Sequence, residues 1–356
     1  MPKKSSSRKI SRRDSSHVTT SRKRQHVELT LSEDVRFRAK RSGLDRFDFV
    51  HNALPELDLA AVDTTTEFLG RHLRLPIMIS CMTGGYKDAL KINRDLAEVC
   101  EEEMIAMGVG SQRQALENSA FHETFRVVRE VAPNIPIIGN IGAAEVARML
   151  DVAPLKRLAE MIRADAFAVH LNPLQEFLQP EGSPNFRGVL AGIQRLVNNL
   201  GIPIIVKEIG AGISGTVAKR LLDVGVRIID VAGAGGTSWA GVESLRRKEE
   251  HPSLFWDWGI PTAHSLQQVA KLREAEAGLT LIGSGGITNG MEAAKCIALG
   301  ADLVASARPL LVTLVQKKKK GLRDLIREWE ETIRGVMFLT GSRNIADLQN
   351  ARLVEC

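Results

Sequence analysis

The sequence predicts a (β/α)8 barrel, and two observations lead to this prediction. From residue 76 onward, short apolar or β-branched segments alternate with longer amphipathic segments, in eight successive pairs. A polar or glycine-rich stretch also follows nearly every apolar segment, which is typical of parallel strands whose C-terminal ends meet at one face. An open, doubly wound sheet of eight strands is the alternative architecture.

The segments expected to form strands are short and mostly apolar. They are residues 76–81, 105–110, 135–140, 166–171, 202–207, 227–232, 279–284 and 302–307. Amphipathic stretches such as "FRGVLAGIQRLVNNL" lie between them and are expected to form helices. Residues 27–75 are expected to form an N-terminal lead-in, and residues 321–337 a C-terminal helix.

Most of the positive charge lies at the N-terminus. The chain has a formal net charge of +6, whereas residues 1–24 hold nine Lys or Arg and one acid. The remaining body is therefore slightly acidic, and we expect no nucleic-acid binding by it. Residues 1–20 are rich in Ser, Lys and Arg and are expected to be a disordered basic tail. Residues 21–356 are expected to form the barrel domain.

The length of the apolar runs and the spacing of the cysteines indicate where the protein is located. No apolar run is long enough to span a membrane, so we expect no membrane association. Cys81, Cys100, Cys296 and Cys356 do not have CxxC spacing, which indicates neither a disulfide framework nor a zinc site. A reducing cytoplasm fits this pattern.

The stretches after the last two predicted strands favour phosphate binding. "IGSGGITNG" (282–290) precedes a predicted helix, and "SARP" (306–309) ends the eighth strand. Backbone N–H groups at glycine turns and helix N-termini bind phosphate, and barrels often use these two loops for that purpose.

A competing pattern is the GxGxxG of residues 210–215, followed by Asp230 at the end of the next strand. This is the dinucleotide-binding fingerprint. However, the strand before it ends in Lys207 and Glu208, where a dinucleotide-binding fold has an apolar strand. The strand–helix alternation also continues on both sides, so the barrel is favoured.

Several side chains after the strands suit a charged ligand. Lys207 suits an electron-rich ring or a phosphate if it points into the mouth. The guanidinium of Arg113 suits bidentate phosphate recognition. Glu176 can hold Mg²⁺ when substrate phosphates complete the coordination shell. His170 and Trp239 have structural alternatives, as a hydrogen-bonded and a packed residue respectively.

The motifs at the strand ends resemble one enzyme family, the type 2 isopentenyl-diphosphate isomerases, which are FMN-dependent (β/α)8 enzymes. The resemblance covers residues 22 to about 310, and the first 21 residues depart from it. The matching motifs are "RKRQH" (22–26), "MTGG" (82–85), "GSQR" (110–113), "GNIGA" (139–143), "HLNPLQE" (170–176), "KEIGAG" (207–212), "GGTSW" (235–239), "SGGI" (284–287) and "SARP" (306–309).

The resemblance implies interconversion of isopentenyl and dimethylallyl diphosphate with FMN, Mg²⁺ and NADPH as the reductant, in a homo-oligomer (a tetramer or octamer). It implies FMN contacts by Cys81, Met82, Thr83, Ser111, Asn140, Lys207, Thr237, Gly285, Gly286, Ser306 and Ala307. It implies that the diphosphate is held, or its pocket lined, by Arg22, Lys23, Ser111, Gln112, Arg113 and His170. Gln175 would bind the substrate at its reacting end as the catalytic residue, and Glu176 would bind Mg²⁺.

The chemistry of this reaction agrees with the residues present. An allylic double bond moves when a proton is added at one carbon and removed from another, yet the sequence shows no paired carboxylates or His–Asp constellation for that task. A reduced flavin can serve instead. The rival on the same barrel is an FMN-dependent 2-hydroxy-acid oxidase, which wants a histidine base in an "HGGR"-like string. Here the corresponding stretch is "GAGGTSW" (233–239). A non-enzymatic flavin- or phosphate-binding module is a third alternative.

Overall fold

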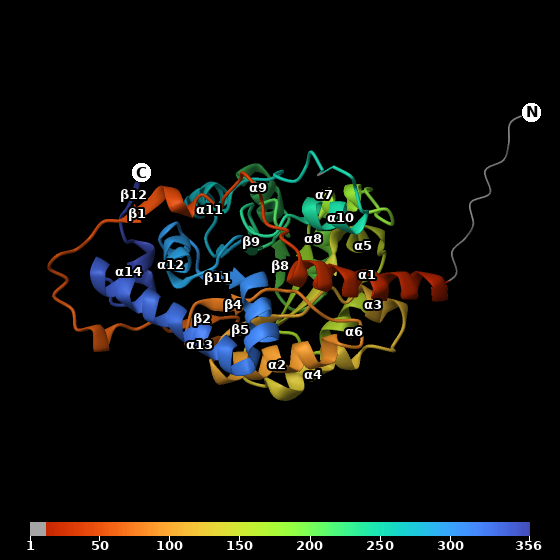
Figure 1. Ribbon diagram of the computed structural model, residues 1–356, viewed down its shortest axis with the longest axis horizontal. Coiled ribbons are helices and arrows are strands. Elements are labelled where there is room, and N and C mark those ends of the chain that lie inside the picture. The colour runs from red at the N-terminus through yellow and green to blue at the C-terminus, as the bar shows by residue number, and fades with distance from the viewer. Residues whose placement is uncertain (1–11, 252) are drawn as a thin grey trace, which may run out of the picture.

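Eight parallel strands close into a barrel in the computed structural model, which describes residues 12–251 and 253–356, with side chains from residue 21. The strands neighbour one another in the order β10-β11-β4-β5-β6-β7-β8-β9. The predicted (β/α)8 barrel is therefore confirmed, and the open-sheet alternative is excluded. Figure 1 shows the strands at the centre and the helices arranged around them.

Every barrel strand overlaps the segment predicted for it. The strands are β4 (Ile77–Ile79), β5 (Ala106–Gly108), β6 (Ile137–Gly142), β7 (Ala166–His170), β8 (Ile204–Lys207), β9 (Ile228–Asp230), β10 (Thr280–Ser284) and β11 (Leu303–Ser306). All of their pairings are parallel, so their C-terminal ends open toward the same face.

The helices fall into two groups. The outer layer that covers the barrel consists of α2 (Ala89–Glu102), α4 (Glu123–Val131), α6 (Ala153–Met161), α8 (Val189–Asn199), α9 (Gly215–Asp223), α11 (Thr262–Ala270), α12 (Gly290–Ala298) and α13 (Arg308–Thr340). Shorter helices follow four strands directly, namely α3 (Arg113–Glu117), α5 (Ala143–Arg148), α7 (Pro173–Leu178) and α10 (Trp239–Arg246). The predicted C-terminal helix lies within α13, which is kinked at Lys318.

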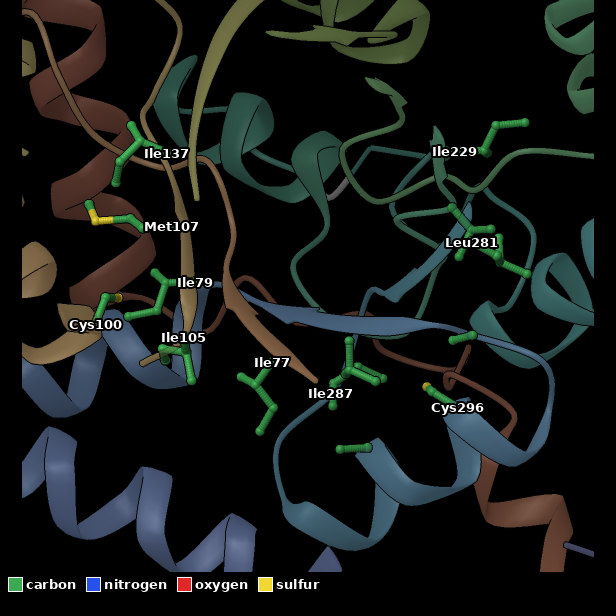
Figure 2. Close-up of a cluster of buried hydrophobic side chains, with 14 of the residues drawn as sticks. Ile77, Ile79, Cys100, Ile105, Met107, Ile137, Ile229, Leu281, Ile287 and Cys296 are labelled. Carbon is green, nitrogen blue, oxygen red and sulfur yellow. The ribbon is translucent and has the colours of Figure 1, made fainter. Parts of the chain in front are cut away.

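The core has two layers because neighbouring residues of a strand face opposite sides. On β4, Ile77 and Ile79 belong to the cluster between barrel and helices, whereas Met78 belongs to the cluster inside the barrel. Figure 2 shows Ile79 beside Ile105 and Cys100 in the outer cluster. Apolar side chains fill the interior, so the barrel is a packed core and not a channel.

A hairpin of the N-terminal lead-in closes the barrel at the end where the strands begin. This hairpin, formed by β2 (Thr66–Phe68) and β3 (Arg71–Leu73), contributes Phe68 and Leu73 to the interior cluster. Strand β1 (Phe47–Phe49) pairs antiparallel with β12 (Leu353–Glu355) near the C-terminus. Three one-turn helices, η1 (Leu44–Arg46), η2 (Leu59–Ala61) and η3 (Lys271–Glu274), and α14 (Ile345–Gln349) complete the elements.

The first element is α1 (Arg12–Ser32), which packs near α3, α10 and α13. Residues 1–11 of the expected disordered tail lie outside the described residues. Over residues 12–20 the structure differs from that expectation, because the backbone is helical and continuous with the part of α1 that contacts the barrel. A helix that is anchored at one end extends at low cost, since propagation adds one hydrogen bond per residue fixed. None of the described helices combines the length and apolar character that a membrane crossing needs.

Candidate active site

A cavity of about 650 Å³ lies at the C-terminal ends of the barrel strands, and α1 forms one of its walls. Residues at the end of every barrel strand line it. Most of the predicted site residues meet there, namely Arg22, Lys23, Cys81, Met82, Ser111, Arg113, Asn140, His170, Gln175, Glu176, Lys207, Thr237, Gly285, Gly286, Ser306 and Ala307.

Two predicted residues, Thr83 and Gln112, do not line the cavity. Thr83 is buried against Asn93. Gln112 is fully buried, its Nε2 donates to the carbonyl oxygen of Leu158 at 3.0 Å, and its Oε1 accepts from the backbone N–H of Asn140 at 3.1 Å. The side chain of Gln112 therefore holds the end of β6 in place.

Three cations from two elements gather on one side of the cavity. Lys23 on α1 donates to the carbonyl oxygens of Gly84, at 2.8 Å, and Ser111. Burial, followed by the charge of Arg22, lowers the pKa of Lys23 to about 7. Burial and then Arg113 also lower the pKa of Arg22. Cations that are desolvated and repel one another form a site for a multiply charged anion.

Two carboxylates hold Arg113 at this site. Its Nε lies 3.4 Å from Oε1 of Glu117 on the same helix. Its Nη1 lies 3.2 Å from Oε1 of Glu145 on α5. Glu145 also lines the cavity, so this ion pair keeps the guanidinium of Arg113 at the cavity wall.

His170 is neutral in this surrounding. Its Nδ1 lies 2.9 Å from Oδ1 of Asn140, which as an acceptor fixes the ring proton on Nδ1. Burial lowers the pKa of His170 to about 3, with further lowering by Lys207, Lys23 and Arg22. His170 can therefore orient Asn140 and line the cavity, but it is a weak base at neutral pH.

The "HLNPLQE" stretch places four polar groups around the start of a short helix. Pro173 begins α7, and the preceding Asn172 donates from Nδ2 to Oε1 of Gln175 at 3.0 Å and to Oε1 of Glu176 at 3.1 Å. The N–H of Ser183 donates to the other oxygen of Glu176 at 2.6 Å. The amide and the carboxylate are thus fixed side by side in the wall of the cavity.

Glu176 is the carboxylate best placed for a metal among those predicted. Across the described residues, no group of three or more His, Cys, Asp or Glu side chains could hold a metal ion by itself. A divalent cation bound by Glu176 would need oxygen ligands from a bound phosphate compound, as the sequence suggested.

A second network includes residues with no role predicted from the sequence. Nε2 of His26 on α1 lies 2.9 Å from Oε1 of Glu243 on α10, and the indole of Trp239 meets the His26 ring edge-on at 5.2 Å. Nε2 of Gln175 reaches the same Glu243 oxygen at 3.5 Å. His26 stands in the quoted "RKRQH" motif, but no local signal connects it with Glu243, which is 217 positions away.

Arg308 fixes the end of α1. Its Nε donates to the carbonyl oxygen of Thr30 at 2.8 Å, and its Nη2 to that of Glu33 at 3.1 Å. These carbonyls lie at the C-terminal end of the helix, where backbone acceptors lack helical partners. The loop after β11 is thereby tied to the helix that carries Arg22 and Lys23.

The floor of the cavity contains a buried ion pair. Nζ of Lys207, at the end of β8, lies 3.7 Å from Oδ2 of Asp230, at the end of β9. Lys207 also donates to the carbonyl oxygen of Glu208 at 2.6 Å. Lys207 lines the cavity, so its ammonium is presented to a ligand above it.

The loops after β9 and β10 pack backbone against backbone and leave a cradle. Gly285 has a φ of +103°, and a Cβ on it would lie 2.1 Å from the carbonyl oxygen of Gly233. A Cβ on Gly236 would lie 2.6 Å from the N atom of Gly286. Beside these loops, α13 begins at Arg308 with its N-terminus directed to the cavity rim. The glycine backbone of these loops, a helix N-terminus and the Lys207 cation together fit the phosphate and the ring of FMN.

Comparisons with known proteins place the chain among the flavin enzymes. The sequence model of the family "FMN-dependent dehydrogenase" matches residues 16–128 and 155–355. The isopentenyl-diphosphate delta-isomerase of Chlorobaculum parvum is 49% identical over 350 residues, which cover 95% of this chain and 97% of the relative. The enzyme of that name from Pseudescherichia vulneris is 45% identical, over 93% of this chain and 95% of the relative. The chain belongs to the isopentenyl-diphosphate delta-isomerase family. The predicted family is confirmed.

Solved structures give the same architecture. A lactate oxidase of Pediococcus acidilactici has a TM-score of 0.67 at 17% identity, over 93% of this chain and 86% of that chain. A single-residue variant of mandelate oxidase has a TM-score of 0.66 at 19% identity, over 96% of this chain and 99% of that chain. At this identity the likeness concerns the fold alone. For this member of the isomerase family, the family match and the cradle together support FMN as the cofactor.

Proposed function

We propose that the protein interconverts isopentenyl diphosphate and dimethylallyl diphosphate with FMN, without net oxidation. The names of its relatives support the reaction. The observation that carries the proposal is that one cavity joins two complementary features. The Arg22, Lys23 and Arg113 cations suit a diphosphate, and Gln175 and Glu176 lie in the wall of the same cavity.

The substrate's charge would be held by the N-terminal helix and the barrel together. Arg22 and Lys23 approach from α1, and Arg113 from the start of α3, the helix after β5. Glu176 would bind Mg²⁺, with diphosphate oxygens completing the shell. These contacts fix the reacting carbons relative to the cavity floor, which is the contribution that positioning makes to catalysis.

The hydrocarbon end of the substrate needs a proton at one carbon and loses one from another. Reduced FMN, when bound, supplies acid–base chemistry that the side chains lack. Gln175 is neutral and orients the reacting end or relays a proton. Its amide is held by Asn172 on one side and faces Glu243 on the other, so its direction is set before the substrate binds.

The contacts to FMN carried over from the resemblance belong to this proposal as well. The cradle of Gly285 and Gly286, the adjacent Ser306 and Ala307, and the floor residue Lys207 support them. NADPH would serve only to reduce the flavin.

An FMN-dependent 2-hydroxy-acid oxidase is the rival function. The loop after β9 supplies Gly235, Gly236 and Thr237 to the cavity in place of the expected histidine base. His26 is paired with a carboxylate, which favours the rival, but the other oxygen of Glu243 already bonds Arg246 at 2.9 Å. Because Glu243 is shared between His26 and Arg246, it stabilises a protonated imidazole of His26 less than an unshared carboxylate would.

An anaerobic assay separates the two functions. We expect isomerase activity only when FMN is reduced, with many turnovers after a single reduction by a small amount of NADPH. Deuterium from the solvent should appear in the product, because the added proton comes from an exchangeable site. NADPH use in proportion to product, or full activity with oxidised FMN, would contradict the proposal. Oxygen consumption with a 2-hydroxy acid would favour the rival.

Two further proposals concern the setting of the enzyme. All four cysteines are free thiols, which supports a reducing compartment such as the cytoplasm. Assembly into a tetramer or octamer stays a prediction from the resemblance, and light scattering during size-exclusion chromatography would test it.

A further inference from the structure

The ion pair at the cavity floor consists of two deeply buried charges. Lys207 is 5% exposed and Asp230 is 0% exposed. The two residues are register partners of neighbouring parallel strands, so both side chains leave the barrel at the same height.

The fold does not need this pair. Just below it the barrel interior is apolar, with Ile205, Ile228 and Ile282 in one cluster. Desolvating two charges costs several kcal/mol for each ion, and a well-packed apolar pair of similar volume is often as stable or more stable. An ion pair at this position therefore calls for a role in the cavity above it.

The two residues differ in their access to the cavity. Lys207 lines the cavity, whereas Asp230 lies behind it. Oδ1 of Asp230 accepts hydrogen bonds from the hydroxyl of Ser284 and from the N–H of Ala232 at 3.2 Å. Oδ2 has no hydrogen-bond donor among the described residues, and it is the oxygen that faces the Lys207 ammonium.

We propose that Asp230 is a positioning residue that sets the reduction potential of bound FMN through Lys207. The proposal rests on the proposed function, in which Lys207 contacts FMN. A cation beside the flavin favours the reduced form, which carries more negative charge, and the carboxylate of Asp230 draws that cation toward the cavity floor and away from the ligand above it. Asp230 thus holds the ammonium at the floor and moderates how strongly the cavity favours reduced FMN.

A double-mutant cycle on the FMN-loaded protein tests this without substrate. The midpoint potential is measured for the wild type, Asp230→Asn, Lys207→Met and the double variant. We expect Asp230→Asn to raise the preference for reduced FMN about tenfold, which is about 30 mV for a two-electron couple. Lys207→Met should lower that preference. In the Lys207→Met background, Asp230→Asn should cause a much smaller shift, because no ammonium is left for the carboxylate to position.

Two outcomes would overturn the proposal. One is an unchanged potential in Asp230→Asn, and the other is an equal shift in both backgrounds, which would show that Asp230 acts independently of Lys207. Asp165→Asn is the matched control. Asp165 is also an ion-paired acid, with Arg71 and Arg129 as partners, but it precedes β7 at the opposite end of the barrel. Its removal should leave the potential unchanged.

Thermal unfolding of the apoprotein provides a second reading. Each single substitution leaves a buried charge without its partner, so both should be less stable than the double variant. If Asp230→Asn does not fold, Asp230→Glu, which keeps the charge, should fold and keep a potential close to that of the wild type. A potential in Asp230→Glu that equals that of Lys207→Met would contradict the proposal. Failure of the isomerase assay alongside a successful cycle would refute the proposed reaction and leave the role of the pair intact.

Discussion

Nε2 of His26 lies 2.9 Å from Oε1 of Glu243, and this contact joins the N-terminal helix to the region after β9. It is one of several attachments of α1 to the barrel mouth among the residues whose side chains the structure describes. Lys23 bonds the backbone of Gly84, and Arg308 bonds the carbonyl oxygen of Thr30. These attachments determine where Arg22 and Lys23 stand relative to the cavity. The three named here lie within the last ten residues of α1.

Removal of residues 1–20 should therefore leave turnover nearly intact. The described attachments of α1 involve residue 23 and later ones, and they should suffice to keep the shortened helix in its place. We expect kcat and KM to stay within about twofold of the full-length values, a change of less than about 0.5 kcal/mol. Steady-state kinetics of the truncated protein test this, and loss of turnover would show that the basic segment takes part in catalysis.

His26→Ala should raise the KM for the diphosphate substrate in the full-length protein. It removes a hydrogen bond to a buried carboxylate, which is typically worth about 1.5–3 kcal/mol, and thereby loosens the helix that presents the two cations. An increase of about tenfold corresponds to the lower end of that range. Unchanged KM would mean that the other contacts of α1, such as those of Lys23, Gln25 and Arg308, are enough to hold it.

The value of kcat/KM should fall as the pH rises through about 7. Burial lowers the pKa of Lys23 to about 7, so the ammonium is protonated below that pH and neutral above it. Only the protonated form attracts a diphosphate, and kcat/KM reports the ionisation of the free enzyme. Lys23→Arg should keep its charge and lose this alkaline limb. An identical limb in Lys23→Arg would assign the titration to another group.

Glu176→Gln should abolish most activity and leave FMN bound. The substitution keeps the size of the side chain but removes the charge that a divalent cation requires. Added Mg²⁺ should restore activity only in part. The absorbance of bound flavin serves as the internal control, because the FMN cradle is formed by loops other than the segment that carries Glu176. Loss of flavin would instead indicate a structural role for this carboxylate.

Gly285→Ala should weaken FMN binding by more than about tenfold. The added methyl would lie 2.1 Å from the carbonyl oxygen of Gly233, and the φ of +103° disfavours any side chain. The matched control is Gly335→Ala in α13, where a Cβ meets nothing within 4 Å. That control should bind FMN normally and gain about 0.5–1 kcal/mol of stability. Fluorescence titration with FMN compares the two variants.

The sequence was sufficient to predict the barrel because its eight strands are separated by clear amphipathic stretches. It also predicted that residues as distant as Asn140 and Lys207 would share a cavity, since the C-terminal ends of parallel strands converge. The sequence pattern does not predict in which direction a single side chain after a strand points. Gln112 follows β5 like its neighbour Ser111, but it points into the protein and bonds the backbone of Leu158.

Contacts between distant segments were likewise beyond prediction from one sequence. Glu243 sits in an ordinary amphipathic helix, and only the position of α1 across the mouth makes it a partner of His26. The helical backbone over residues 12–20 is a similar case. Local composition favours disorder there, but the adjoining residues are held by the barrel.

The pairing of β1 with β12 has a consequence for how the chain is made. Asp48 lies opposite Val354, and the N–H of Cys356 donates to the carbonyl oxygen of Arg46 at 2.8 Å. During translation, Phe47–Phe49 therefore has no partner until residues 353–355 have left the ribosome. Such a distant pairing forms late, because closing a long loop is slow. The edge of β1 therefore stays unpaired throughout synthesis of the chain. Translational pausing in the last third of the mRNA should increase the binding of chaperones to the nascent chain.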